Sequence, residues 1–433
     1  MALVLDVHVE GIAAPVGRLM RVDEDVVHFQ YLTDALPYPL SLSLPVRDQP
    51  YGDAATRGFF ANLLFENAMR DQVMERYGLD FNDIVGLLFH LGRDCPGAIS
   101  CVPQGEGLAK QPGNLETDYD ALDGETLVEI MTSLRDRRRL PEQAQDPSPL
   151  AGVQGKIALT RLRDGRYALP KPGQNVPTTH ILKVPRLRDM SDVASEHLVT
   201  GLMAEVQTHP VSQTEVLGAG DLQGLLITRF DRTVDGPLVS RLHQEDFAQA
   251  LGLGPSLKYQ RNGTPARSFS AKAIGRVLQQ TENPGLARAA FLDITLANLL
   301  LGNTDNHAKN HALLYTGPRP SLAPAYDIFP TLIDAEATHQ LAFDIGAAKM
   351  TDDITAEDLE KLVLDLGFPR FAPALKRRAQ SLTILAVGRI DDLQGPGREM
   401  IGDAIAEQSR HLARALGLSA TIAERDALIL NRP

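Results

Sequence analysis

Three oxygen-bearing side chains near residue 310 have the types and spacing that phosphoryl transfer requires. Asp305 and Asn310 are separated by four residues of a short polar segment, and Asp327 follows after an apolar run and a turn. A carboxylate near the attacking hydroxyl and an amide oxygen on a metal ion, both on one rigid turn, would serve that reaction. Two carboxylates and an amide oxygen also form an all-oxygen set of ligands that suits Mg²⁺.

The spacing between Asp305 and Asn310 is the Asp-x-x-x-x-Asn spacing of a protein-kinase catalytic loop. Asp and Asn are also common turn residues, so the segment could be only a polar loop after a buried helix. Residues 292–301 are apolar nearly all round, which predicts that the preceding helix is buried. The unbroken polar run 303–307 follows that helix directly, and solubility alone does not explain it. The pattern therefore favours a catalytic role.

The composition is that of an ordinary globular protein with room for two or three domains. The chain has 433 residues, of which 43% are hydrophobic, and no apolar run approaches the length of a transmembrane helix. Apolar and polar residues alternate at its N-terminus, which is typical of a strand and not of a signal peptide. Two cysteines are too few for a disulfide scaffold. We expect a cytoplasmic protein without a membrane partner. The net charge of −12 argues against broad nucleic-acid binding by this chain alone, although a local basic patch remains open.

The first hundred residues predict a small α+β unit. Residues 1–50 alternate apolar and polar residues between Gly and Pro, which is typical of short strands. We expect helices over 58–78 and 83–91, the second with Asn82 as its N-cap, and a return to a strand before residue 103. Residues 104–148 are poor in apolar residues apart from a short helix at 127–134, and they indicate a linker.

A second α+β unit follows, with an order of elements typical of the phosphate-binding half of a kinase. A Gly-containing loop at 150–156 leads into a strand, Lys183 lies on a further strand, and Glu196 lies on the next helix. Each feature is weak alone, because such loops are common and Lys183 with Glu196 could be a surface ion pair. Their order upstream of the Asp305 segment is more specific.

From about residue 230 the pattern becomes helical. We expect helices at 245–253, at 286–301 and at 356–366, the last ending at Gly367. A hairpin whose turn is residues 317–320 should place Asp327 just beyond its second strand.

With these residues in hand, the chain resembles the HipA family of serine/threonine kinases, the toxins of bacterial type II toxin–antitoxin pairs. The resemblance implies an α+β protein with a kinase-like fold, an α+β N-terminal half carrying an extra N-terminal subdomain, and an all-helical C-terminal half. We expect an accessory subdomain at 1–103, a linker at 104–148, a nucleotide-binding subdomain at 149–229 and a catalytic domain at 230–433. The matching segments appear in family order and are 59–64 (Phe-Phe-Ala-Asn-Leu-Leu), 151–154 (Ala-Gly-Val-Gln), 178–183 (Thr-Thr-His-Ile-Leu-Lys), 229–232 (Arg-Phe-Asp-Arg), 244–247 (Gln-Glu-Asp-Phe), 258–259 (Lys-Tyr), 305–310 (Asp-Asn-His-Ala-Lys-Asn) and 326–327 (Tyr-Asp).

The resemblance also implies roles for individual residues toward ATP and Mg²⁺. Asp305 would be the catalytic carboxylate, Asn310 and Asp327 would hold Mg²⁺, and Lys309 could reach the transferring phosphate. For His307 we favour a bracing role. On the nucleotide side, Lys183 would contact the ATP phosphates, and Glu196 is our inference for its partner. The phosphate loop would comprise Ala151, Gly152, Val153, Gln154, Gly155 and Lys156, and the hinge against adenine would comprise Thr228, Arg229 and Phe230.

For partners, the family implies a small helix-turn-helix antitoxin (HipB-like) that binds the kinase and the operator DNA. It implies an aminoacyl-tRNA synthetase as the protein substrate. The chain departs from the family at Pro149, where relatives have a Ser whose phosphorylation can switch the phosphate loop off. Because Pro149 has no hydroxyl and Ser148 is poorly placed to replace it, we expect no efficient switch of this kind.

Two other functions remain open at this point. The same catalytic residues would serve a small-molecule kinase, so the acceptor is not defined. A kinase-shaped co-regulator without activity, acting only through an antitoxin on operator DNA, is a different class. The complete set of Lys183, Asp305, Asn310 and Asp327 argues against that class.

Overall fold

The computed structural model describes residues 3–23, 26–64, 68–141, 155–189, 191–395, 397–422 and 424–432. These residues form two compact units. The first comprises residues 1–193, 214–255 and 313–319, and the second comprises residues 194–213, 256–312 and 320–433.

The first unit begins with a four-stranded antiparallel sheet in the order β3-β2-β1-β4. The apolar residues Leu5, Val7 and Phe29 are fully buried, and the intervening Asp6 and His8 of the central strand β1 are buried as well. The strands are β1 (Val4–Val9), β2 (Gly17–Asp23), β3 (Val26–Tyr31) and β4 (Ile99–Pro103), and the helical segments are α1 (Asp53–Phe60), η1 (Ala61–Leu63), α2 (Ala68–Tyr77) and α3 (Ile84–Leu91).

The predicted cap of α3 was wrong by one residue. The side chain of Asp83, not that of Asn82, accepts a hydrogen bond of 2.9 Å from the backbone amide of Gly86. This carboxylate also receives Arg21, so it neutralises a basic side chain as well as capping the helix. Both residue types suit an N-cap, and the choice between them depends on a partner 62 residues away in the chain.

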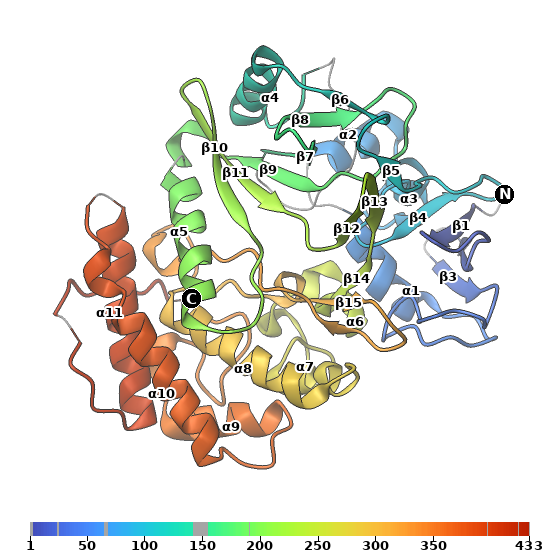
Figure 1. Cartoon of the computed structure of the whole chain (residues 1–433). Coiled ribbons are helices and arrows are strands. Elements are labelled where there is room, and N and C mark those ends of the chain that lie inside the picture. Colours follow the sequence, from blue (N-terminus) through green and yellow to red (C-terminus); the bar gives the residue numbers. More distant parts are fainter. Residues whose placement is uncertain are drawn as a thin grey trace. The chain divides into compact units, whose positions relative to one another are not determined.

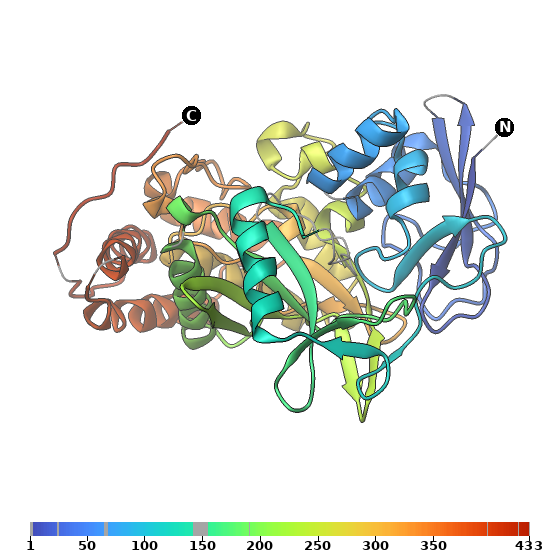
Figure 2. The same ribbon diagram turned by 90° about the horizontal axis from the view of Figure 1, so that it is seen from above.

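A six-stranded sheet in the order β10-β11-β9-β7-β8-β6 forms the next part of the first unit. Helix α4 (Gly124–Arg137) lies across one face of this sheet (Figure 2) and buries Ile130, Met131 and Leu134 against it. The strands are β6 (Tyr119–Ala121), β7 (Gly155–Arg161), β8 (Tyr167–Pro170), β9 (His180–Val184), β10 (Thr214–Ala219) and β11 (Leu222–Thr228). The helix therefore covers one face of the sheet, and the alternate residues of each strand point to the other face.

The prediction of an all-helical C-terminal half was wrong, because several strands lie beyond residue 230. The first two of them join β5 in a small sheet of order β12-β13-β5. The predicted helix at 245–253 is a strand followed by only one helical turn, which starts at a capping box between Asp246 and Gln249. The elements are β5 (Gly113–Asn114), β12 (Arg232–Asp235), β13 (Leu238–Arg241), β14 (His243–Asp246), α6 (Phe247–Ala250), β15 (Ala312–Tyr315) and β16 (Ser321–Leu322).

A buried ionic cluster ties β13 to the N-terminal sheet within the first unit. The Arg241 guanidinium donates to Glu10 (2.9 Å) and to Asp94 (3.1 Å), and Lys110 lies 3.1 Å from Asp94. Burial alone would raise the pKa of Asp94, but Lys110 and Arg241 outweigh it and hold that pKa well below its usual range. Removing one partner would leave a buried charge uncompensated, which is strongly destabilising.

The second unit is built mainly from helices around α8. Helix α8 starts with Pro284 after the cap residue Asn283 and packs against α7, α10 and α11 (Figure 1). Within the unit, the buried Asp293 of α8 receives two hydrogen bonds of 2.7 Å from Arg378 of α10. The helices are α5 (Ser191–Val206), α7 (Ala271–Gln279), α8 (Pro284–Leu300), α9 (Ala356–Asp365), α10 (Pro373–Val387) and α11 (Arg398–Leu416). The buried helix predicted at 286–301 is thus confirmed within two residues.

Short 3₁₀ turns connect these elements, and two of them contribute to the site below. They are η2 (Leu187–Asp189), η3 (Pro255–Leu257), η4 (Gln260–Asn262), η5 (Ala308–Asn310), η6 (Thr331–Ile333), η7 (Thr351–Asp353) and η8 (Ile390–Asp392). In the described ranges no helix is both long and apolar enough to cross a membrane. Cys95 and Cys101 are buried free thiols.

Candidate active site

The loop that carries Asp305 starts where α8 leaves the core. Gly302 has a φ of +73°, a left-handed conformation that glycine adopts without strain, and it turns the chain out of the helix. The next residue, Asn303, is bound back to the helix through two hydrogen bonds of 2.9 Å to the backbone and side-chain oxygens of Asn298. The side-chain oxygen of Asn303 then accepts from the amide of Asp305 at 3.1 Å. The position of Asp305 is therefore set from the end of the buried helix.

A buried threonine from η6 holds the same loop from the other side. The hydroxyl of Thr331 accepts from the amide of Thr304 at 2.8 Å and donates to the carbonyl of Gly302 at 3.2 Å. The Thr304 hydroxyl lies 2.9 Å from it and must be the donor in that pair, because the Thr331 proton is already used. One hydroxyl thus satisfies several polar groups of the loop, which is required because these residues are buried.

The side chain of Asp305 is partly buried beside a tyrosine. The hydroxyl of Tyr259 donates to Asp305 Oδ1 at 2.6 Å. Burial raises the pKa of Asp305 above its ordinary value, the Tyr259 hydrogen bond lowers it, and the negative charge of Asp327 raises it further. Lys258 and Arg261 act in the lowering direction. The structure therefore brings the charges of Asp305 and Asp327 together, as the sequence predicted.

Asn310 has its amide nitrogen committed within the loop. Its Nδ2 donates to the backbone carbonyl of Asp305 at 2.9 Å, which closes the segment between the two residues. This leaves the amide oxygen as the atom that Asn310 can offer to a cation. The preceding residue, Lys309, is half-buried, and its backbone carbonyl accepts from the Tyr326 hydroxyl at 2.7 Å. Tyr326 thereby joins the segment before Asp327 to the loop.

Asp327 is exposed and has a φ of +58°, one of two non-glycine residues in the described ranges with a positive φ. This conformation is uncommon for a side chain other than Asn, Asp or Gly, and such strained positions cluster at functional sites. Together with the amide oxygen of Asn310, the two carboxylates supply only oxygen ligands, the set that Mg²⁺ prefers. A cation would also relieve the repulsion that raises the pKa of Asp305. The donor set therefore fits a magnesium ion.

His307 lies buried in the loop and is neutral at physiological pH. Burial, aided by Lys258, lowers the pKa of His307 to about 3. Its ring makes an edge contact with Tyr259, with ring centroids 5.2 Å apart. The geometry fits the bracing role predicted for His307, because the ring positions the tyrosine that binds Asp305.

The predicted nucleotide-binding residues lie mostly in the first unit. Lys183 is buried on β9 and pairs in register with Lys156 on β7 and with Leu225 on β11. Since Leu182 faces α4, the adjacent Lys183 must project from the opposite face of the sheet. Lys156 projects from that same face as its cross-strand partner. Two lysines are thus brought together on the face that α4 does not cover.

The remaining predicted positions are less well defined. Thr228 ends β11, and the Arg229 amide donates to the carbonyl of Thr179 at 3.0 Å, which continues the sheet into the segment with Phe230. Ala151, Gly152, Val153 and Gln154 lie outside the described residues, as do Ser148 and Pro149.

Gly155 and Glu196 complete the set of predicted residues. Gly155 starts β7, and a Cβ there would lie 2.7 Å from the carbonyl of Leu134, so its glycine permits close packing against α4. Glu196 is buried on α5 in the second unit. Its pairing with Lys183 stays a prediction.

The comparisons with known proteins identify the family of this chain. A model of the HipA N-terminal domain matches residues 5–102, and a model of the HipA-like C-terminal domain matches residues 148–387. These matches define a protein of mixed α/β structure in the class of HipA-like serine/threonine kinase toxins. The chain belongs to the HipA family.

Individual relatives bear this out. The putative kinase Y4mE of Sinorhizobium fredii is 32% identical over 83% of this chain and 84% of its own length. The serine/threonine-protein kinase toxin HipA of Shewanella oneidensis is 29% identical over 80% of this chain and 79% of its own length. A solved structure of HipA from Shewanella oneidensis MR-1, in a complex with HipB and operator DNA, superposes with a TM-score of 0.75 at 25% identity and covers 96% of this chain and 98% of that one.

Replacing Thr331 by valine should loosen the loop without changing its shape. The valine removes the hydroxyl that serves Thr304 and Gly302, which we expect to cost about 1–3 kcal/mol locally. Hydrogen exchange of the peptide covering residues 302–310 should then be about tenfold faster. The matched control is Thr338→Val, at an exposed threonine outside the loop. Equal exchange in both variants would show that Thr331 does not hold the loop.

Proposed function

We propose that this chain is an ATP-dependent serine/threonine protein kinase that acts as the toxin of a toxin–antitoxin pair. The observation that carries the proposal is the Asp305 carboxylate, which accepts from Tyr259 at 2.6 Å, lies near the charge of Asp327 and shares its loop with the amide of Asn310. A loop with only a structural role has no need of two carboxylates that repel each other. A phosphotransfer site needs both of them, one for the acceptor hydroxyl and one for the metal ion. ATP and Mg²⁺ are the cofactors of this proposal.

In the proposed reaction, Asp305 receives and orients the hydroxyl of the acceptor. One of its oxygens is occupied by Tyr259, so the other is directed to that hydroxyl and accepts its proton. Asn310 and Asp327 hold Mg²⁺, which neutralises charge on the phosphates when bound. Lys309 would balance the charge that develops on the transferring phosphate.

For the nucleotide, we propose that Lys183 contacts the ATP phosphates and that Glu196 orients Lys183. The buried position of Lys183, paired in register with Lys156, supports this, because two cations on one face attract a polyphosphate. Residues 151–156 would form the phosphate loop, and Thr228, Arg229 and Phe230 would contact adenine as the hinge.

The substrate and partners are proposed from the family. The likeness to HipA solved with HipB and operator DNA supports a helix-turn-helix antitoxin as partner, with DNA reached mainly through that antitoxin. The net charge of −12 agrees with this division, because the chain itself is poorly suited to a polyanion. We propose an aminoacyl-tRNA synthetase in the cytoplasm as the protein substrate.

Removing the tyrosine hydroxyl should shift the pH dependence of phosphate transfer. In Tyr259→Phe, burial and the charge of Asp327 still raise the pKa of Asp305, and the hydrogen bond that lowered it is gone. Because the ionised carboxylate is the active form, the acid limb of the kcat/KM profile should move to higher pH. The control is Tyr326→Phe, whose hydroxyl contacts a backbone carbonyl instead. An unmoved acid limb in Tyr259→Phe would argue against Asp305 as the base.

Removing the charge of Asp327 should weaken binding of Mg²⁺-ATP. Asparagine tolerates the left-handed conformation, so Asp327→Asn changes the charge while keeping the backbone. We expect the affinity measured by calorimetry to fall by about tenfold or more, with a higher Mg²⁺ requirement, because the metal loses an anionic ligand. Asp334→Asn, at an exposed carboxylate in the same unit, is the control. Unchanged affinity and Mg²⁺ dependence would make Asp327 structural.

Expression of the chain alone should slow growth, and a helix-turn-helix protein encoded beside it should relieve this effect. Asp305→Asn should abolish the toxicity, while Glu357→Gln, at an exposed carboxylate on α9, should leave it unchanged. Growth curves after induction, with and without the neighbouring protein, provide the measurement. Equal toxicity of Asp305→Asn would mean that growth inhibition does not depend on catalysis.

A further inference from the structure

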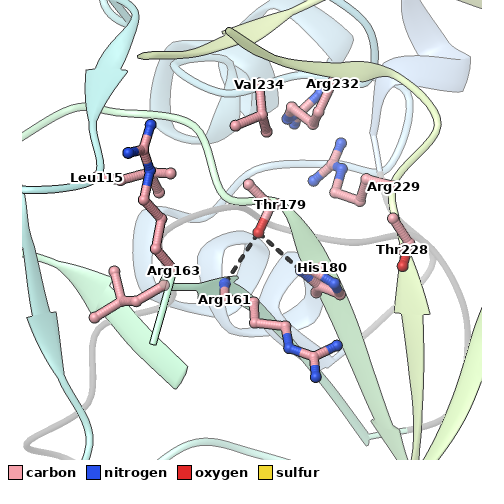
Figure 3. A pocket seen from close by; sticks show the side chains of 10 residues that line it. Leu115, Arg161, Arg163, Thr179, His180, Thr228, Arg229, Arg232 and Val234 are labelled. Carbon is pink, nitrogen blue, oxygen red and sulfur yellow. Dashed lines mark hydrogen bonds between the residues drawn. The ribbon is translucent and has the colours of Figure 1, made fainter. Parts of the chain in front are cut away.

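A second candidate binding site lies entirely within the first unit. It is a pocket of about 290 Å³ at the ends of β7, β9 and β11 (Figure 3). Its volume is at the lower end of the roughly 300–1,000 Å³ typical of small-molecule sites. The pocket therefore suits a small ligand.

Four of the ten residues that line this pocket are arginines. Arg161 and Arg163 come from the end of β7 and the turn after it, and Arg229 and Arg232 come from the segment after β11 (Figure 3). Among the described residues that line it, none is acidic. Four guanidinium groups around one small cavity give it a strongly positive potential.

Acidic neighbours offset this charge only in part. Glu215 lies 2.8 Å from Arg161, and Glu116 lies 3.9 Å from Arg163, both in exposed pairs that contribute little.

The two arginines that follow β11, Arg229 and Arg232, form the inner pair and share the carboxylate of Asp231. Asp231 accepts two hydrogen bonds from Arg229, at 3.0 and 2.9 Å, and a third from Arg232 at 2.8 Å. The buried charge of Asp94 also acts on both guanidinium groups. With Arg241, Lys110 and Glu10, this buried network has four cations and three anions, so one positive charge remains in excess.

The two inner arginines also keep hydrogen-bond donors without a protein partner. Their side chains are only 6% (Arg229) and 1% (Arg232) exposed. Arg229 Nη1 and Arg232 Nη2 are buried and have no hydrogen-bond acceptor among the described residues. The other donors of Arg232 are used by Asp231 and by the carbonyl of Thr178. Burying unpaired donors of a charged group is costly, and an acceptor brought to the wall of the pocket would relieve that cost.

We propose that this pocket binds a small ligand through a phosphate group. Guanidinium groups bind phosphate oxygens through paired hydrogen bonds, and a phosphate anion would balance the positive charge that the buried carboxylates leave in excess. Arg229 and Arg232 would bind the phosphate at the base, while the exposed Arg161 and Arg163 would close over it from the mouth. The Thr179 hydroxyl, which already accepts from the amide of Arg161 at 3.1 Å, lies on the same wall.

This site does not depend on the proposed kinase function. Thr228 and Arg229 are also the proposed adenine hinge, but a hinge contacts adenine through backbone atoms, whereas the pocket uses the Arg229 side chain. Arg161 and Arg163 have no role in the proposed nucleotide site. Substituting them therefore separates the two sites experimentally.

The test is calorimetric titration of the full chain with orthophosphate, pyrophosphate and phenyl phosphate, in Mg²⁺-free buffer at constant ionic strength set with chloride. The double variant Arg161→Ala/Arg163→Ala should bind each phosphate at least about tenfold more weakly than the wild type. Both side chains are largely exposed, so the fold should be retained, and a melting curve checks this. The matched control is Arg166→Ala, at an exposed arginine of the same hairpin that pairs with Asp164 and does not line the pocket.

The three titrated compounds distinguish the possible sources of the phosphate group. Tight orthophosphate binding identifies the free ion as the ligand. A clear preference for phenyl phosphate instead identifies a phosphorylated organic molecule. Either result supports the site when the double variant loses that binding. Equal affinity of the double variant and the wild type would overturn the proposal, as would no binding by the wild type at millimolar phosphate. A parallel loss of Mg²⁺-ATP affinity in the double variant would also overturn it, by showing that the pocket belongs to the nucleotide site.

Discussion

The proposed active site depends on how one polar loop leaves a buried helix. Helix α8 is enclosed on nearly all sides, so the residues after it must find internal partners for their backbone groups. Asn298 supplies them from inside the helix, and the hydroxyl of Thr331 supplies them from η6. Because these partners are buried, their hydrogen bonds hold the backbone of the loop against the helix. The direction of the Asp305 side chain follows from that arrangement.

The electrostatics of the loop are those of a site prepared for a cation. Burial and the nearby Asp327 both disfavour the charged form of Asp305, and Tyr259 and Lys258 favour it. The balance leaves a carboxylate whose pKa is raised, which makes it a better proton acceptor than a fully solvated one. The left-handed conformation of Asp327 adds backbone strain in the same place. Repulsion and strain at one position are tolerated when they serve binding or catalysis.

Much of this site could be predicted from the sequence, because its main elements are local. The polar segment from Asp305 to Asn310 and the buried helix before it both show as short-range patterns. Tyr259 and Thr331 could not be assigned roles, because they meet the loop from 46 and 27 residues away, and no periodicity encodes such contacts. Lys258 and Tyr259 stood out only as part of the family pattern.

The fold shows the same division between local and distant effects. Strands β12 to β14 were missed because each has only four residues, too few for an alternation to be distinguished from a helical pattern. The capping box at Asp246 is a true helix start, but the helix it starts is a single turn. The strands gain their stability from pairing and from buried ionic contacts such as Arg241 with Glu10 and Asp94, which link distant segments.

The central claim is that the loop around Asp305 transfers phosphate from ATP to serine or threonine. The most direct measurement incubates the purified chain with labelled ATP, Mg²⁺ and a cell lysate, and follows label in phosphoserine and phosphothreonine. We expect the wild type and Glu357→Gln to label protein, and Asp305→Asn to be slower by roughly 10²–10⁴-fold, the range for loss of general-base catalysis. Labelling by Asp305→Asn at the wild-type rate would contradict the proposed role of Asp305 in phosphate transfer.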